Sequence, residues 1–478
     1  MRSPRETTAA AATTSTAVSR RALVLAAAAL GAAWIFDLTV LRTPVLTHFV
    51  AGGRQIPPAT PLYAFWMPIA RPQSIAFIGA AILLVALAAR LVDTARTSRA
   101  VFTLVLGTTA IVLPLALFVV RQPLSELGAL LLTYKNEEVL ADAARIRVYA
   151  PFLRNYVEHM PQLSLHGKHF PPGHATWLYA LIHTFGPGTL QVAIAVLSAF
   201  AAGVVLWFAA FRQFAEERGA RAGALLLLAC PSLLDFALTS MDAVLFGASG
   251  LATCLAARAA ARLAPSDGDR RGHTALFAFA VATGAALFIA TMLSFSALPL
   301  GLMIGLFLLV TGRHAFGRAT LAVLAIGASF AACGLLLWTA SGFSILACLA
   351  RAIELNKEFM SHVVKRDAHE LYGYLSYGNA AGFAIGAGVA LVAATGSRLA
   401  RGRSAWTSFT TASAITLAVM IFGGIYFMET ERIWMYAMPW LAGIVATRGA
   451  PDDGSLRVLL AVGTAQALAL EALLFTLW

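Results

Sequence analysis

Long runs of apolar residues, bounded by short polar or charged stretches, recur along the whole chain. Most have the length of about 20 residues that lets a helix cross the hydrocarbon core of a bilayer. The pattern predicts an all-α polytopic membrane protein of about 13 transmembrane helices, with outer loops that carry short juxtamembrane helices. The predicted spans are 22–41, 75–92, 101–120, 188–211, 222–238, 243–261, 274–291, 297–310, 319–339, 380–394, 408–427, 433–446 and 456–478.

Composition agrees with this pattern. Of 478 residues, 59% are hydrophobic and only 12% are charged, whereas a soluble domain is nearer half apolar and a quarter charged. No polar segment is long enough to form a soluble domain. The predicted organisation is a disordered tail (1–21), an N-terminal module of three transmembrane helices (22–120), an outer catalytic loop (121–173), and a transmembrane core (174–478) with a second outer loop at 343–379.

The net charge of +12 would suit a nucleic-acid partner, but the placement of the charges argues against one. With a cytoplasmic N-terminus, 21 of the 35 basic residues and eight of the 23 acidic residues fall in cytoplasmic turns. An excess of basic residues in short cytoplasmic loops is the usual mark of orientation. We therefore expect a multi-pass protein with a cytoplasmic N-terminus and no nucleic-acid partner. The Arg-rich, Lys-poor usage is typical of a bacterial inner (plasma) membrane protein from a GC-rich genome.

The first outer loop holds three acidic residues, Glu137, Glu138 and Asp142. Glu138 and Asp142 are four residues apart and share one face of a helix. Two carboxylates on one face repel each other, which can raise a pKa as a general base requires. The alternative is a solvated helix face in an exposed loop.

The same loop ends in a basic segment with His166, Lys168, His169 and His174, in which two prolines and a glycine precede His174. The prolines force an extended approach, and basic groups on a rigid turn at the membrane surface suit a phosphate. A zinc site is the alternative, although no helical His pair or nearby Cys defines its geometry.

Two further groups lie at predicted outer boundaries. Asp242 lies two residues after Ser240, at the junction of two predicted helices. An acidic side chain so near hydrocarbon is costly and usually has a function; the alternative is a helix cap. Glu431 and Arg432 open a later helix, and Arg432 would bind a phosphate strongly. The alternative there is an ion pair within the segment together with an aromatic belt at Trp434 and Tyr436. If these groups form one site, Glu138 or Asp142 should face Asp242 and Arg432 across one cavity.

In the order of these features, residues 134–439 resemble the GT-C superfamily. Its members are membrane glycosyltransferases that take sugar from a polyprenyl-phosphate carrier, such as protein mannosyltransferases and lipid A aminoarabinose transferases. The resemblance lies in the acidic pair that opens a long outer loop, the Pro-Pro-Gly entry at 171–173, the hairpin at 231–242, and the late Glu-Arg step followed by Tyr436 and Pro439.

The resemblance implies a sugar donor linked to a polyprenyl phosphate, a lipid, glycan or protein acceptor, and contact with membrane lipid. The resemblance implies Asp142 or Glu138 as the general base. It also implies that Arg432, Lys357, Lys168 and His169 bind the phosphate and stabilise its charge as it departs. We expect no cofactor; some members use a divalent metal, and Asp242 would then be a candidate ligand. The family's acids usually follow the first helix directly, so Asp37 is an alternative base.

Two other functions remain open. A transporter or lipid flippase of envelope precursors would need charged residues in mid-helix along a path, and Glu471 is the exception in a chain that nearly lacks them. A scaffold in envelope assembly would tolerate neutralisation of Glu138, Asp142 and Asp242.

Overall fold

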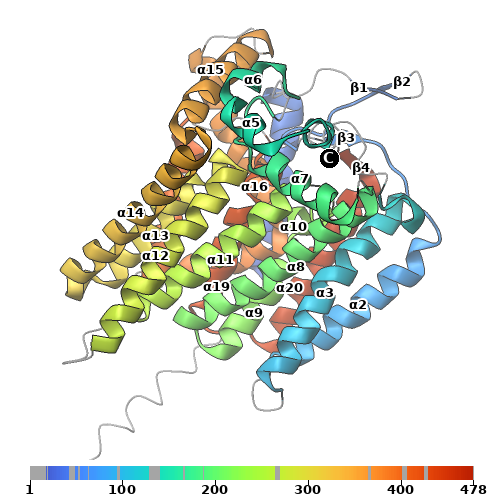
Figure 1. The fold of residues 1–478 in the computed structure, drawn as a ribbon. Helices are drawn as coiled ribbons and strands as arrows, with labels where there is room; N and C mark the ends of the chain where they lie inside the picture. The colour runs from blue at the N-terminus through green and yellow to red at the C-terminus, as the bar shows by residue number, and fades with distance from the viewer. Residues whose placement is uncertain are drawn as a thin grey trace, which may run out of the picture.

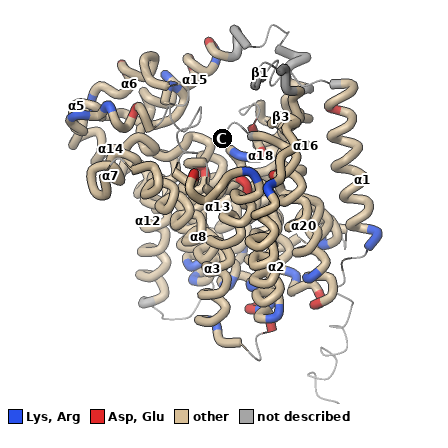
Figure 2. Tube along the Cα trace, turned by 90° about the vertical axis from the view of Figure 1, so that its right-hand side faces the viewer, with Lys and Arg blue, Asp and Glu red and all other residues tan. Residues whose placement is uncertain are grey.

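The structure, a computed structural model, describes residues 18, 20–41, 49–51, 54–62, 64–93, 97–128, 140–164, 167–186, 188–238, 240–263, 270–363, 368–400, 406–424 and 429–476. These residues form a bundle of helices (Figure 1). The strands and several short helices gather at one end of the bundle, which we call the loop end; the opposite end is called the arginine-rich end (Figure 2).

Eight helices of the described part are long and apolar enough to cross a membrane, which confirms the predicted all-α polytopic membrane fold. They are α1 (Arg20–Phe36), α3 (Arg99–Arg121), α8 (Thr189–Phe214), α11 (Asp242–Ala260), α12 (Arg270–Leu293), α14 (Phe316–Ser341), α16 (Ala368–Leu399) and α20 (Asp453–Leu473). Shorter apolar helices accompany them: α2 (Ser74–Arg90), α13 (Leu298–Thr311), α17 (Ser408–Phe422) and α19 (Met438–Ala446). The total of 13 spans stays a prediction.

The remaining elements are mostly short. The helices are α5 (Tyr149–Arg154), α6 (Tyr156–His159), α7 (Gly173–Phe185), α9 (Glu217–Leu227), α10 (Pro231–Asp235), α15 (Ile345–Val363) and α18 (Thr430–Ile433). Single turns are η1 (Asp37–Leu41), η2 (Leu124–Glu126), η4 (Met160–Gln162), η5 (Phe295–Ala297), η6 (Arg313–Ala315) and η8 (Met435–Ala437). Strand β1 (Phe49–Ala51) pairs antiparallel with β2 (Arg54–Ile56), and β3 (Ala64–Trp66) pairs with β4 (Leu474–Thr476).

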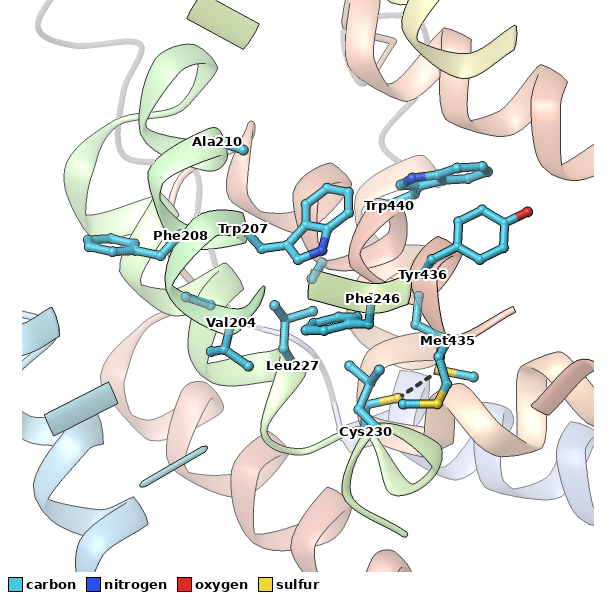
Figure 3. Close-up of a cluster of buried hydrophobic side chains, with 14 of the residues drawn as sticks. Val204, Trp207, Phe208, Ala210, Leu227, Cys230, Phe246, Met435, Tyr436 and Trp440 are labelled. Carbon is cyan, nitrogen blue, oxygen red and sulfur yellow. Dashed lines mark hydrogen bonds between the residues drawn. The ribbon is translucent and has the colours of Figure 1, made fainter. Parts of the chain in front are cut away.

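Small residues let α8 and α11 approach closely at the centre of the bundle. A Cβ on Gly203 would lie 2.6 Å from the Phe246 ring, and one on Gly247 would lie 2.8 Å from the carbonyl oxygen of Ala199. Helices in a membrane gain little from the hydrophobic effect between them, so close backbone packing of this kind provides the contact. Around it, Trp207, Phe246 and Trp440 form part of a buried core built from α8, α9, α11 and α19 (Figure 3).

The predicted span 222–238 is two short helices rather than one. Helix α9 ends at Leu227, and α10 starts at Pro231, which lacks an N–H and cannot continue the α9 ladder. Nearly all of this stretch is buried inside the protein. Irregular backbone at membrane depth is tolerated where protein rather than lipid surrounds it.

Helix α16 is also interrupted, at Gly388, whose φ of 88° lies outside the helical region. The break releases backbone groups, and the side chain of Gln466 on α20 satisfies two of them. Its Nε2 donates to the Ile385 carbonyl at 3.1 Å, and its Oε1 accepts from the Val389 N–H at 2.8 Å. Gln466 thereby replaces two of the lost helical hydrogen bonds.

The arginine-rich end is held by a charge network centred on Glu217. Its carboxylate accepts from Arg212 at 2.7 Å, from Arg221 at 3.1 Å and from Arg99 at 3.3 Å. Burial alone would raise the pKa of Glu217, but the hydrogen bonds from Arg212 and Arg221 hold that pKa below its ordinary value. Arg221 also donates to the carbonyls of Leu91 and Thr97, which joins α9 to the turn between α2 and α3.

Candidate active site

Asp142 lies in a helical turn at the loop end and is 5% exposed. Its two carboxylate oxygens accept hydrogen bonds from the Ser164 backbone N–H at 3.3 and 3.0 Å. Arg145 reaches within 3.9 Å, but its side chain is 76% exposed, so this ion pair adds little. Gly167 lies directly against Asp142, since a Cβ there would be 2.6 Å from Oδ2. The segment after α6 therefore folds back over the carboxylate.

A small cavity adjoins Asp142, with a volume of about 10 Å³. Tyr156, Phe170 and His174 are among the side chains that line it. This volume holds about one water molecule. A sugar or an acceptor therefore does not fit beside Asp142 unless the covering segment moves.

Tyr156 holds that covering segment in place. Its hydroxyl donates to the carbonyls of Gly167 at 3.2 Å and Phe170 at 2.9 Å. Burial, followed by the proximity of Cys348 and Asp142, raises the pKa of Tyr156 well above its ordinary value, so the phenol keeps its proton. The sequence analysis missed this residue, although Tyr149, Phe152 and Tyr156 show a helical aromatic spacing that could have indicated a buried face.

The basic segment that follows reaches α7 and α15. Lys168 is half-buried, and its N–H donates to the Ser164 carbonyl at 3.0 Å. The His169 ring meets the Phe359 ring of α15 edge-on at 5.7 Å, and the exposed Lys357 lies on the same helix. His174 is buried beside Phe170. Glu137, Glu138 and His166 lie outside the described residues.

Arg432 forms the second charged cluster at the loop end, between two carboxylates. Nη1 donates to Asp242 Oδ2 at 2.5 Å, and Nη2 donates to Glu429 Oε2 at 2.5 Å. The three side chains are only 7%, 2% and 15% exposed, respectively. Burial lowers the pKa of Arg432, but the charges of Asp242 and Glu429 outweigh it and raise that pKa above its ordinary value. The guanidinium therefore stays charged.

The partners of this cluster are held differently. The Ser240 hydroxyl donates to Asp242 Oδ2 at 2.8 Å and accepts from the Asp242 N–H at 3.1 Å, so Asp242 is fixed at the start of α11. Glu429 instead has a φ of 59°, a left-handed conformation that few residues other than glycine adopt. Such strain occurs preferentially at functional sites.

Helix α18 is pressed against α16. Glu431 is 3% exposed, and a Cβ on Gly386 would lie 2.9 Å from its Cβ. The neighbouring Thr430 hydroxyl donates to the Asn379 carbonyl at 2.9 Å. The predicted ion pair within this segment is present as Arg432–Glu429. The aromatic belt is wrong, because Trp434 and Tyr436 are both 0% exposed and face the protein core.

The corner between α12 and α13 contacts the chain segments next to both clusters. The Tyr436 hydroxyl, four residues after Arg432, donates to the Ser296 carbonyl at 2.5 Å. On the other side, a Cβ on Gly173 would lie only 2.0 Å from the Met292 carbonyl oxygen. Asp242 and Arg432 do not line the cavity beside Asp142. A single cavity shared by the two clusters stays a prediction.

The alternative base, Asp37, is fully buried at the end of α1. One turn earlier, the Ala33 carbonyl accepts from the Tyr377 hydroxyl of α16 at 2.8 Å. Within the described residues, no group of three or more His, Cys, Asp or Glu side chains is placed to hold a metal ion. The catalytic and substrate-binding roles of all these residues stay predictions.

No family model matches the sequence, and no curated protein matches it. Two crystal structures of ArnT from Cupriavidus metallidurans match part of the fold at 17% identity. The apo structure aligns with a TM-score of 0.41 over 63% of this chain and 54% of its own; the one bound to undecaprenyl phosphate aligns with 0.46 over 73% and 60%. This chain thus spans little more than half the length of ArnT. At TM-scores below 0.5 the likeness assigns neither a family nor an activity.

Proposed function

We propose that this protein is a membrane glycosyltransferase of GT-C type, which moves a sugar from a polyprenyl-phosphate carrier to an acceptor at the loop end. The observation that carries the proposal is the buried, permanently charged Arg432 between Asp242 and Glu429 at that end. A guanidinium binds phosphate oxygens with two parallel hydrogen bonds, which suits the phosphate of a lipid carrier.

The cluster suggests how a phosphate would enter. Arg432 already has two carboxylate partners, so an incoming phosphate must replace one of them. Glu429 is the more exposed of the two and has a strained backbone, whereas Asp242 is 2% exposed and held by Ser240. In the proposal, the phosphate displaces Glu429, while Asp242 keeps the guanidinium in place.

Asp142 is the proposed general base. It would take the proton of the acceptor hydroxyl as that oxygen bonds to the anomeric carbon of the sugar. The bond between this carbon and the phosphate oxygen breaks, and its electron pair leaves with the phosphate, whose charge Arg432 stabilises. Because the cavity beside Asp142 holds about one water, acceptor binding must displace the segment that Tyr156 holds.

Lys168, His169 and Lys357 are proposed to guide the phosphate to the site from the surface of the loop end. Glu137, Glu138 and His166 are proposed to contribute from the same loop. The proposed acceptor is a lipid, glycan or protein. The proposal includes no nucleic-acid partner, and addition of a chelator to the transfer assay tests for a divalent metal.

The test is sugar transfer by membranes enriched in the protein, supplied with a panel of radiolabelled undecaprenyl-phosphate sugars. We expect Asp142→Asn to lower transfer by 100-fold or more, with normal protein level. Glu429→Gln should leave the turnover measurable while changing the KM for the donor. Glu354→Gln is the control, because Glu354 is an exposed acid of α15 whose ion pair among the described residues is with Arg351 at 2.9 Å. Absence of donor consumption by wild type would refute the proposal.

A transporter is the second candidate function, favoured by the broken helix α16. Interrupted helices build the binding sites of many transporters. Here the Gln466 side chain forms hydrogen bonds with two backbone groups freed at the break, so fewer of these groups are left to bind a substrate. Uptake of labelled precursor into vesicles without donor cleavage would support this candidate.

The proposed location is a bacterial inner membrane with a cytoplasmic N-terminus. The arginine-rich end would then face the cytoplasm, and the loop end would face outward. A reporter that is active only outside the cytoplasm tests this orientation. It is fused at position 163, at the loop end, and in a matched variant at position 216, at the arginine-rich end. Activity at 216 rather than 163 would reverse it.

A further inference from the structure

A groove with a volume of about 290 Å³ lies between α2 and α20, away from the candidate active site. Its walls are apolar, with Ile82 and Val85 on one side and Leu460 and Leu468 on the other. Ile82 is 49% exposed, so the groove opens onto the outer surface of the bundle. In a membrane protein that surface faces lipid.

One charged residue, Arg457, lines the groove near the start of α20. Its side chain is exposed, and no hydrogen bond or ion pair joins it to another part of the chain that the structure describes. The nearby acids are engaged elsewhere: Asp453 pairs with Arg218 at 2.8 Å, and Asp452 accepts from Ser455. Arg90, also exposed, closes the last turn of α2 at the same end.

A polar group lies deeper in the groove. Thr464 is 5% exposed and lines the groove, and its hydroxyl has no hydrogen-bond partner among the described residues. It is seven residues beyond Arg457, which is about 10 Å along the helix. A buried hydroxyl without a partner is costly, so a ligand group or water is expected to meet it.

We propose that this groove binds one anionic diacyl phospholipid, with its phosphate at Arg457 and an acyl chain along the apolar walls. Charge complementarity selects the headgroup, since each arginine near the membrane surface adds about 1 kcal/mol of attraction to anionic lipid, or about fivefold in affinity. The apolar walls fit the acyl chain that follows the headgroup. This inference does not depend on the proposed glycosyltransferase activity.

The test is native mass spectrometry of the full-length protein titrated with phosphatidylglycerol. We expect one tightly bound molecule in wild type, and a fivefold loss of apparent affinity in Arg457→Ala. Arg262→Ala is the matched control, because Arg262 is an exposed arginine that follows α11 at the same end and does not line the groove. Equal losses in both variants would mean non-specific charge attraction and overturn the proposal.

A second pair of variants tests the groove itself. Ala461 and Ala469 are both exposed on α20, but only Ala461 lines the groove. Ala461→Phe should fill it and abolish tight binding, whereas Ala469→Phe should bind as wild type does; an equal thermal midpoint confirms folding. If Ala461→Phe does not fold, Ala465→Phe serves, since Ala465 also lines the groove. Retained binding of phosphatidylglycerol by Ala461→Phe would overturn the proposal. Equal affinity of wild type for phosphatidylcholine, or tighter binding of undecaprenyl phosphate than of phosphatidylglycerol, would also overturn it.

Discussion

Replacement of Arg432 by methionine tests whether the charge cluster at the loop end is integral to the fold. Methionine keeps most of the length of the side chain and removes its charge. It leaves Asp242, which is 2% exposed, without the guanidinium that lies 2.5 Å away. Glu429 loses the same partner, but it is 15% exposed and can recover some hydration.

The expected cost is about 3–5 kcal/mol, the usual penalty for removing one partner of a buried ion pair. An unfolding entropy of about 2.1 cal/mol/K per residue, taken over 478 residues, makes 1 kcal/mol correspond to about 1 °C. Arg432→Met should therefore lower the melting midpoint by about 3–5 °C.

Three of the four cysteines, Cys230, Cys254 and Cys348, are buried, so a thiol-reactive fluorescent dye reports unfolding in detergent. The same assay should show a double variant, Arg432→Met with Asp242→Asn, to be more stable than Arg432→Met alone, because the second change removes the unpaired buried charge. Two outcomes would refute the reasoning: a midpoint for Arg432→Met within about 1 °C of wild type, which corresponds to a cost below about 1 kcal/mol, or simple additivity of the two changes.

Three other changes test the fold around the site. Gly173→Ala forces a Cβ against the Met292 carbonyl oxygen, 2.0 Å away, and should destabilise by about 1–3 kcal/mol; Gly301→Ala, with no atom within 4 Å of the added Cβ, should be neutral or stabilising in the same dye assay. Gln466→Met leaves two α16 backbone groups without partners and should cost about 2–4 kcal/mol; an unchanged midpoint would mean that water replaces the amide. Asp452→Ala removes the cap of α20, worth about 1 kcal/mol. Hydrogen bonds from Ser455 hold the pKa of Asp452 below its ordinary value, so this contribution is fully present above about pH 4 and declines as pH falls further; a difference from wild type that stays constant as pH falls below about 4 would contradict the assignment.

The sequence by itself determined the membrane fold and the approximate position of most helices. A helix that crosses lipid must satisfy its own backbone hydrogen bonds and cover itself with apolar side chains, so the constraint is local and visible in the sequence. The Arg-rich turns indicated which loops lie at the same end of the bundle, because the charge of a short loop is also a local property of the sequence. The ion pair of Arg432 with Glu429 was also within reach, because the two residues are three apart.

Only the tertiary structure decided how the polar residues are used. Asp242 meets Arg432 across 190 positions of chain, and no local pattern predicts that contact. Whether Trp434 and Tyr436 face lipid or core depends on which helices surround them, since lipid and protein interior are equally apolar. The break in α16 is possible because Gln466 on another helix replaces the lost hydrogen bonds. The helices could be predicted because the constraint on them is local. The site could not be predicted, because its residues make contacts that are distant in the sequence.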